Sequence, residues 1–512
     1  MAPPLSKPAL RACSVVLFKD RPFVGDAPSF AAYTPGCPGP WSKVILRLQT
    51  SAKGTQYDRL GAIWLDRAEL MRFTTAEPTR HGISYTVEKD VTVYAPLMRS
   101  PGSVTVSLAN YLSRTHDGVY RLTAEMEFYR AADAAHAAPL PGRIVPVENE
   151  AEATPWAVHG ALAETLRALP RNISRARLDL YASNHDCDEF WYSNVPDAYA
   201  AAHKNDGLCG GGTYREIDVQ IDGRAAYVVY PFPYIWTGGM NPLLWRPLPA
   251  IDALNVPPYE VDLNPWAGVL SDGKPHTIAI SVYGNRGIWP LDGNLLLWQD
   301  RASASTGGAI EHDDFEAPQV FTADRLGGSG GTLLQSAIEN WRVSGYVNTS
   351  RGRVAYSVAT QMHFENRQML ELKTGEQKAS QDTQVTSTYT TVEAGRVRKR
   401  TAVLEYPIAV DVKSPPLGAG SPYAYTINAS VKQARKAVAG ARSCTFTVTG
   451  SAMLERRKNG TDASASGNTS ETYECSGRNS FNLSATARDG ALLSHTSQRR
   501  TQWKSNPPTS QR

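Results

Sequence analysis

Two short segments carry the carboxylates that hydrolysis of an amide or glycosidic bond requires. They are Gln56-Tyr57-Asp58-Arg59 and Cys187-Asp188-Glu189-Phe190-Trp191. Amide hydrolysis needs one group that activates water and another that protonates the departing nitrogen, and two carboxylates in different environments can divide these roles. The spacing alone is weak evidence, because Asp and Glu are usually solvated and Asp58-Arg59 also fits an exposed ion pair.

Aromatic residues are concentrated around the second segment and a later one. Trp191 follows Glu189 directly, and the stretch 236–247 contains Trp236 and Trp245. Sugar rings stack on Trp or Tyr and need polar partners for their hydroxyls, so this mixture is typical of a carbohydrate cleft. The alternative for any single tryptophan is a place in a sandwich core, and for Trp245 that interpretation is the stronger one.

The sequence gives little support for a metal site or for a serine nucleophile. The ten histidines are scattered without a close pair, which argues against a copper-binding oxygenase. We therefore predict no metal and no cofactor. His185, between Asn184 and Asp186, fits a hydrogen-bonded loop residue or a substrate contact. The chain also lacks the Gly-x-Ser-x-Gly motif of a serine nucleophile.

Charge and hydropathy exclude some partners. The 53 Lys and Arg against 49 Asp and Glu are spread along the chain, so no nucleic-acid partner is expected. No apolar run reaches the roughly 18 residues of a membrane span, so no membrane partner is expected. Residues 1–7 lack the apolar core of a signal peptide, and we expect any export signal to have been removed.

The six cysteines form three pairs by proximity along the chain: Cys13 with Cys37, Cys187 with Cys209, and Cys444 with Cys475. Disulfides at these pairs imply an oxidising, extracytoplasmic compartment, which is secreted, periplasmic or vacuolar. Asn-x-Ser/Thr sequons agree with such a compartment, although chance in a Ser/Thr-rich chain explains them nearly as well. They begin at Asn172, Asn348, Asn428, Asn459, Asn468 and Asn482.

The elements that must position these side chains are strands. Apolar and polar residues alternate in short runs, and Asp222-Gly223 between two such runs predicts a tight hairpin turn. The runs are 103–108, 121–128, 216–221, 277–282 and 444–448. With 40 Gly and 34 Pro between runs, the sequence favours an all-β sandwich or jelly-roll architecture. One short window, 158–169, has helical spacing.

Breaks in the pattern divide the chain into three regions. Residues 131–141, followed by the acidic 148–152, resemble a linker, and 303–308 is a second break. We predict an N-terminal β-sandwich at 1–140, a second at 150–305 and a β-rich C-terminal domain at 306–512. Within the last, 327–331 is expected to be a flexible joint and 497–512 to be disordered.

Longer motifs resemble the plant-type peptide N-glycosidase A family. The resemblance runs in order from about Cys13 to Asp300, and its motifs include Gln56 to Asp66, Thr75 to Thr79, Val87 to Thr92, Glu189 to Asn194, Tyr214 to Glu216, Thr237 to Gly239, Asn241 to Pro247 and Asn294 to Trp298. It implies hydrolysis of the bond between asparagine and the first sugar of an N-linked glycan, with N-glycosylated peptides and glycoproteins as partners.

A more distant resemblance to flavobacterial peptide N-glycosidase F implies two adjacent jelly rolls with the site between them. Its aromatic-Asp-Arg and Cys-x-Glu-aromatic segments match Asp58 and Glu189, which are therefore the predicted catalytic residues. A further glutamate of that enzyme would fall near Asn110, where this chain has no carboxylate, so Asn110 or Glu77 could take that role.

The mechanism implied is metal-free. Asp58 would be the general base, or less favourably a nucleophile, and Glu189 would supply the acid or orient the substrate. The predicted substrate-binding residues are Arg59, Glu77, His185, Asp188, Trp191, Arg215 and Trp236. A glycan-binding module without catalysis and a glycosidase cutting between sugars are the competing interpretations.

Overall fold

The computed structural model describes residues 5–133, 136–414, 425–456, 462–476, 479–489 and 491–501. Within them the chain is dominated by strands, which confirms the prediction of an all-β fold. Neighbouring strands pair antiparallel in each sheet. No helix of the described residues is long and apolar enough to cross a membrane.

The first sandwich packs two four-stranded sheets against each other, with strand orders β1-β8-β3-β6 and β2-β7-β4-β5. Alternate residues of β3 and β8, such as Leu46 and Leu122, face Ile63 and Val106 of the other sheet and form its core. The strands are β1 (Cys13–Phe23), β2 (Ser29–Tyr33), β3 (Trp41–Lys53), β4 (Leu60–Leu65), β5 (Ala68–Thr74), β6 (Ile83–Asp90), β7 (Gly102–Leu108) and β8 (Val119–Arg130), with the 3-10 helix η1 (Thr92–Arg99) between β6 and β7.

The second sandwich has strand orders β14-β11-β16-β9 and β10-β15-β12-β13. Its strands are β9 (Arg143–Val147), β10 (Ala161–Leu166), β11 (Ile173–Ala182), β12 (Ile217–Ile221), β13 (Arg224–Val229), β14 (Tyr259–Asp262), β15 (His276–Val282) and β16 (Leu291–Gln299). The connections contain α1 (Asp197–Ala202) and the 3-10 helices η3 (Asp186–Asp188), η4 (Trp191–Ser193), η5 (Pro242–Leu244) and η6 (Asn264–Trp266). Asp222 and Gly223 join β12 to β13 with φ of 53° and 77°, the left-handed geometry of the predicted hairpin turn.

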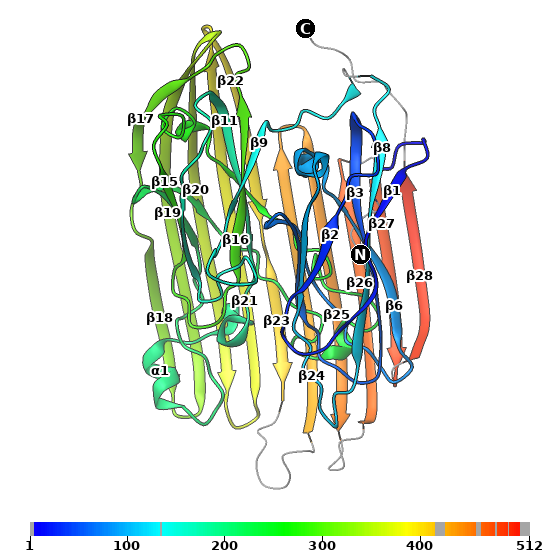
Figure 1. Cartoon of the computed structure of the whole chain (residues 1–512). Helices are drawn as coiled ribbons and strands as arrows, with labels where there is room; N and C mark the ends of the chain where they lie inside the picture. The colour runs from blue at the N-terminus through cyan, green and yellow to red at the C-terminus, as the bar shows by residue number, and fades with distance from the viewer. Residues whose placement is uncertain are drawn as a thin grey trace.

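The C-terminal region forms one large sheet, 12-stranded in the described residues. Its long strands run along the length of the molecule (Figure 1). They are β17 (Gly307–Asp314), β18 (Gln319–Gly327), β19 (Gly330–Thr349), β20 (Gly352–Glu371), β21 (Glu376–Glu393), β22 (Arg396–Glu405), β23 (Ile408–Lys413), β24 (Tyr425–Ala439), β25 (Arg442–Arg456), β26 (Asp462–Cys475), β27 (Asn479–Arg488) and β28 (Ala491–Thr501). One face is buried: Val343 and Met362 belong to the same core as Leu178 and Ile217 of the second sandwich.

A connection between β13 and β14, residues 230–258, contacts all three parts of the molecule, and we call it the central loop. Towards the first sandwich, Thr74 N–H donates to Ala253 O at 2.9 Å and Val256 N–H donates to Arg72 O at 2.9 Å. Towards the C-terminal sheet, Gln433 Nε2 donates to Pro233 O at 2.6 Å. The central loop therefore couples the large sheet to the first sandwich.

Three local predictions were wrong. The window 158–169 contains strand β10, whose pairing with β15 buries Leu162 and Leu166; this i, i+4 pair fits a helix as well as a strand. Residues 327–331 are the turn between the paired strands β18 and β19, not a joint. Residues 497–501 belong to β28, and the rest of the predicted disordered tail lies outside the described residues. All six cysteines are paired as predicted.

Candidate active site

Asp58 and Glu77 leave the same edge of the first sandwich. Leu60 at the start of β4 pairs with Thr74 at the end of β5, so the segments that precede and follow these strands lie together. Arg59 N–H donates to Thr75 Oγ1, and Thr75 N–H donates to Arg59 O, both at 2.9 Å. The hairpin register therefore places the two carboxylates side by side, although they are 19 positions apart in the sequence.

Tyr120 of β8 holds these two segments together through its hydroxyl group. Its hydroxyl lies 2.8 Å from Tyr57 O and 3.0 Å from Ala76 O, the carbonyls just before Asp58 and Glu77. Ala76 N–H in turn donates to Tyr85 Oη at 3.1 Å. These buried polar contacts fix the backbone on which both carboxylates stand.

Gly238 of the central loop lies between the two carboxylates. Its N–H donates to the Asp58 carboxylate, and a Cβ added to Gly238 would lie 2.7 Å from both Asp58 Oδ1 and Glu77 Oε1. The neighbouring Thr237 hydroxyl contacts the Thr75 carbonyl oxygen and the Asp58 carboxylate. Only a residue without a side chain lets the backbone approach this closely.

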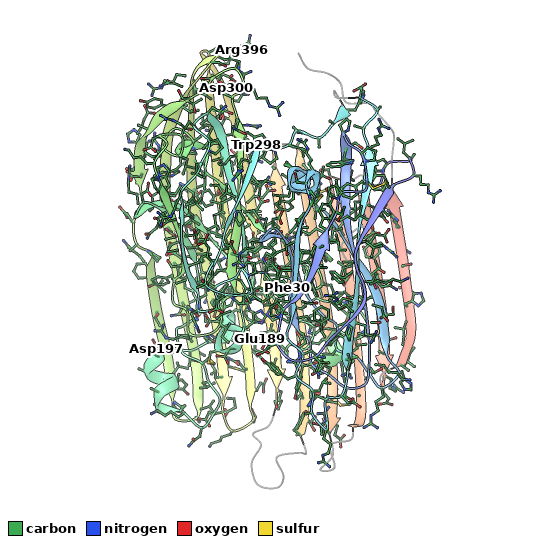
Figure 2. All side chains as sticks on the ribbon, viewed as in Figure 1. Phe30, Glu189, Asp197, Trp298, Asp300 and Arg396 are labelled. Atoms are coloured by element: carbon green, nitrogen blue, oxygen red, sulfur yellow. A yellow bond between two sulfur atoms is a disulfide. The ribbon has the colours of Figure 1, made fainter. Side chains whose placement is uncertain are left out.

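Glu189 reaches the same place from the second sandwich. It follows η3, and Figure 2 shows it in the lower half of the molecule between the ribbons of the two sandwiches. Asn184 Nδ2 holds the turn by donating to Glu189 O at 2.8 Å. Among the described residues, no hydrogen bond or ion pair satisfies the Glu189 carboxylate. Asp58 and Glu77 are both close enough to disfavour its ionisation.

Burial raises the pKa of all three carboxylates, and the groups that oppose this rise differ from one to the next. Burial raises the pKa of Asp58 to about 6, against the lowering effects of the Gly238 N–H and Arg59. Burial also raises the pKa of Glu77 to about 7, opposed by Arg246, whose Nη2 lies 3.4 Å from Glu77 Oε2. For Glu189, burial and the negative charge of Asp58 raise the pKa to about 7, with no cation to oppose them.

An exposed aromatic surface adjoins the carboxylates. Tyr57 is 54% exposed and stacks on His116, with ring centroids 4.3 Å apart and an interplanar angle of 23°. The Arg59 guanidinium lies 5.8 Å from the Tyr57 ring centroid, and Arg59 Nη2 donates to Gln56 Oε1 at 2.7 Å. Arg59 Nε is buried and has no hydrogen-bond partner among the described residues, so it can reach a ligand only if the site opens.

Four of the predicted substrate contacts are buried instead. Asp188 and Arg215 form an ion pair at 2.7 Å, with both side chains fully buried, and Trp289 Nε1 donates to Asp188 Oδ2 at 2.7 Å. Trp191 and Trp236 are each 1% exposed. The prediction of direct substrate contact does not fit these positions, because a buried side chain reaches no ligand unless the structure opens.

His185 packs against Trp236. Their rings stack with centroids 5.2 Å apart, and Trp236 stacks on Tyr234 on its other face. Burial lowers the pKa of His185 to about 3, so the ring is neutral at physiological pH. Trp236 Nε1 donates to Asn184 O at 2.6 Å, which connects this stack to the turn that carries Glu189.

Asn110 does not take the role of a third carboxylate. It is buried, and its Nδ2 donates to Phe23 O and Gly118 O at 3.1 and 3.0 Å. Glu77 instead lies against Asp58. The sequence reasoning missed Tyr120 and the individual roles of Thr237, Gly238 and Arg246; the signal for the last three was their place in the family motifs Thr237 to Gly239 and Asn241 to Pro247.

Metal ligation is not favoured by the geometry. Among the described residues, no group of three or more His, Cys, Asp or Glu side chains is arranged to hold a metal ion. The Asp58 carboxylate instead accepts from the Gly238 N–H beside Arg59, and the Glu77 carboxylate lies against Arg246. Such an arrangement divides protons between an acid and a base.

The sequence of this chain is similar to one known protein family. A family model described as peptide N-acetyl-beta-D-glucosaminyl asparaginase amidase A matches residues 5–315. The peptide-N4-(N-acetyl-beta-glucosaminyl)asparagine amidase A of Prunus dulcis is 33% identical over 389 residues, which is 72% of this chain and 68% of that protein.

Solved structures with a likeness to this chain include PNGF-II and PNGase F. The TM-score with PNGF-II is 0.38 at 13% identity, over 56% of this chain and 65% of that chain. The TM-score with PNGase F of Flavobacterium meningosepticum, a glycosylasparaginase, is 0.35 at 12% identity, over 56% of this chain and 96% of that chain. By its match to the family model and to the Prunus protein, the chain belongs to the peptide N-acetyl-beta-D-glucosaminyl asparaginase amidase A family.

Proposed function

We propose that this protein is a peptide N-glycosidase that hydrolyses the amide bond between an asparagine side chain and the first N-acetylglucosamine of an N-linked glycan. The observation that carries the proposal is the convergence of Asp58, Glu77 and Glu189, from two sandwiches, beside an exposed aromatic surface. The name of the Prunus relative supports the same reaction. Its substrates would be N-glycosylated peptides and glycoproteins.

Asp58 is the base of the proposed reaction. Its pKa of about 6 leaves it ionised near neutral pH, and the Gly238 N–H orients its carboxylate. It takes a proton from a water molecule, whose oxygen then attacks the side-chain carbonyl carbon of asparagine. The Arg59 guanidinium, which lies beside the exposed Tyr57 ring, donates to the carbonyl oxygen as negative charge develops there.

Glu189 is the acid. Its raised pKa of about 7 keeps the carboxyl group protonated at mildly acid pH. It donates this proton to the glycosylamide nitrogen as the C–N bond breaks. The peptide is left with aspartate in place of asparagine, and the glycan departs as a 1-amino sugar. Glu77, whose pKa burial raises to about 7, lies beside Asp58, and its contact with Arg246 holds it there.

The buried residues act as positioning groups in this proposal. The Asp188–Arg215 pair and Trp289 fix the turn that carries Glu189. The stack of His185 on Trp236 supports the same turn through the bond from Trp236 to Asn184 O. Trp191 fills the core behind it. None of these side chains needs to touch the glycan.

An extracytoplasmic location fits this activity. The pairs Cys13–Cys37, Cys187–Cys209 and Cys444–Cys475 are disulfides, which persist in oxidising compartments. N-linked glycoproteins are found in or beyond the same compartments. The Cys187–Cys209 bridge also closes the segment that holds Glu189, so reduction is expected to impair activity.

Mass spectrometry of an N-glycopeptide incubated with the purified protein in heavy-oxygen water tests the proposal. Conversion of the glycosylated asparagine to heavy-oxygen-labelled aspartate is the expected result. A peptide that retains one N-acetylglucosamine would indicate a glycosidase instead. An unchanged glycopeptide between pH 4 and 9 would favour a glycan-binding module.

Substitution of Asp58 tests the assignment of the base. We expect Asp58→Asn to reduce kcat by about 10² to 10⁴-fold, the usual contribution of a general base, with the fold intact. Asp324→Asn, on exposed strand β18, is the matched control and should retain activity. Near-normal turnover by Asp58→Asn would show that the base lies elsewhere.

A further inference from the structure

The C-terminal sheet contacts the part of the central loop that carries Gly238 and Arg246, and these contacts have no role in the mechanism so far. Asn241 Nδ2 donates to Ile427 O of β24 at 3.1 Å. The Thr469 hydroxyl of β26 donates to Leu244 O in η5. The Thr469 bond is buried and the Asn241 bond is partly buried, and both join the sheet to the five residues between Gly239 and Trp245.

The sheet also approaches this segment through a glycine. A Cβ added to Gly467 of β26 would overlap the Leu243 carbonyl oxygen, and one added to Gly450 of β25 would reach Leu244 Cδ2 at 3.4 Å. Gly467 has no unusual backbone conformation, since its φ lies outside the left-handed region. The close approach to Leu243, and not backbone geometry, is what a side chain at this position would disturb.

Two residues separate Asn241 from Gly238, and one separates Leu244 from Arg246. On one side, Trp245 Nε1 donates to Gly239 O at 2.9 Å and so joins η5 to the residue after Gly238. On the other side, Arg246 directly follows Trp245 and lies 3.4 Å from Glu77. A displacement of η5 would therefore move the Gly238 N–H away from Asp58 and Arg246 away from Glu77.

The sheet adds a charge of its own to the site. Arg456, at the end of β25, is close enough to lower the pKa of Glu77. Its guanidinium lies 5.5 Å from the ring centroid of Tyr425, at the start of β24. The start of β24 and the end of β25 therefore lie near the carboxylates of the site.

We propose that the C-terminal sheet is a working part of the active site, in which Thr469 and Gly467 are positioning residues that hold η5 so that Gly238 and Arg246 face Asp58 and Glu77. The inference rests on the proposed function of that site. A displacement of about 1 Å can cost a hundredfold in rate, so a small shift of η5 should be measurable.

The test compares Thr469→Val and Gly467→Ala with two matched controls. Thr449→Val replaces an exposed threonine of neighbouring β25, and Gly307→Ala adds a methyl group where no atom lies within 4 Å. For each protein, kcat and KM are measured on an N-glycopeptide between pH 4 and 9, with circular dichroism and Tm as measures of folding.

We expect kcat to fall about threefold to tenfold for Thr469→Val and at least tenfold for Gly467→Ala, with KM little changed. The acidic limb of the pH profile should move to higher pH, because the Gly238 N–H normally lowers the pKa of Asp58. A purely structural role of the sheet would lower Tm without moving that limb.

The proposal is overturned if folded Thr469→Val has the kcat and pH profile of the wild-type protein. Because valine has nearly the shape of threonine, Thr469→Val should fold and still tests the proposal if Gly467→Ala fails to fold. An inactive wild-type protein would contradict the proposed function instead. Loss of activity in the controls as well would mean that any change to the sheet is damaging, and would also overturn the specific role of Thr469 and Gly467.

Discussion

At the scale of single residues, the site depends on the raised pKa values of three buried carboxylates. Asp58 has an N–H donor and a neighbouring cation, Glu77 has Arg246, and Glu189 has neither among the described residues. Like charges so close together cannot all be ionised without cost, so Asp58, with a pKa of about 6, ionises first and Glu189, with a pKa of about 7, keeps its proton to higher pH. The same arrangement predicts both the pH dependence of the reaction and that of stability.

The pH profile of kcat/KM should be bell-shaped. Activity requires ionised Asp58 and protonated Glu189, so the rate should rise through about pH 6 and fall through about pH 7. Because the carboxylates interact, the measured values belong to the group and not to one residue. Glu189→Gln should lose the alkaline limb and about 10² to 10⁴-fold in rate. An unchanged alkaline limb in this variant would exclude Glu189 as the acid.

Glu189 should also destabilise the folded protein at high pH. Its folded-state pKa of about 7 exceeds the ordinary value of 4.5, so the stability it contributes is present below pH 4.5 and lost as pH rises through 7. Thermal unfolding of Glu189→Gln should therefore match the wild-type protein at pH 4 and show a higher Tm at pH 8.5. Equal Tm values at both pH values would contradict the raised pKa.

Gly238 should tolerate no side chain. The Cβ of Gly238→Ala would meet both Asp58 Oδ1 and Glu77 Oε1 at 2.7 Å, so the carboxylates or the loop must move. We expect at least a hundredfold loss of kcat/KM with the fold retained. Gly307→Ala, in open space, is the control, and turnover numbers with circular dichroism provide the measurement. Wild-type kinetics for Gly238→Ala would show that the loop is not held as described.

At the scale of elements, the register of the β4–β5 hairpin determines that Asp58 and Glu77 meet. Tyr120 of β8 reinforces that register, because its hydroxyl contacts the carbonyls on both sides of the hairpin. Burial raises the pKa of Tyr120, so the hydroxyl remains a donor throughout the working range.

Removal of that hydroxyl should affect activity more than folding. Tyr120→Phe leaves two carbonyl groups short of a donor, which should cost about 1 to 3 kcal/mol of stability. We expect kcat to fall about tenfold as the segments carrying Asp58 and Glu77 loosen. Tyr129→Phe, on the same strand but bonded to Glu127, is the control. Urea unfolding and glycopeptide kinetics would separate the two effects, and equal kinetics for both variants would refute the role of Tyr120.

The packing of the elements also limits how much of the fold and of the candidate site can be predicted from the sequence. Local alternation and the Asp222-Gly223 turn indicated strands and a hairpin, and family motifs pointed to Asp58, Glu77 and Glu189, which the fold brings together. The sequence left Trp236 open between a sugar cleft and the core, and it did not indicate the pairing of Asp188 with Arg215, since both depend on how distant segments pack. The place of Gly238 depends on a loop that meets Asp58 across 180 residues of sequence.

At the scale of the whole molecule, the two sandwiches meet through buried charges. Arg72 of β5 donates to Glu69 Oε2 at 2.7 Å and to Asp292 Oδ1 of β16 at 2.9 Å, and Trp64 Nε1 donates to Asp292 Oδ2 at 2.7 Å. Lys89 Nζ donates to Tyr181 Oη at 2.8 Å close by, and burial lowers the pKa of Lys89 to about 8. Because Asp58 and Glu189 belong to different sandwiches, this interface fixes the distance between base and acid.

Loss of Arg72 should therefore damage both stability and catalysis. Arg72→Met removes the guanidinium that pairs with the buried Glu69 and Asp292, which should cost about 3 to 5 kcal/mol. Arg121→Met removes an exposed pair with Asp20 and should leave the stability nearly unchanged. Urea unfolding measures both. Asp292→Asn combined with Arg72→Met should recover part of the loss, because it removes one of the stranded charges. If Arg72→Met were as stable as Arg121→Met, the buried network would not hold the sandwiches together, and the separation of Asp58 and Glu189 would have to be maintained by the central loop alone.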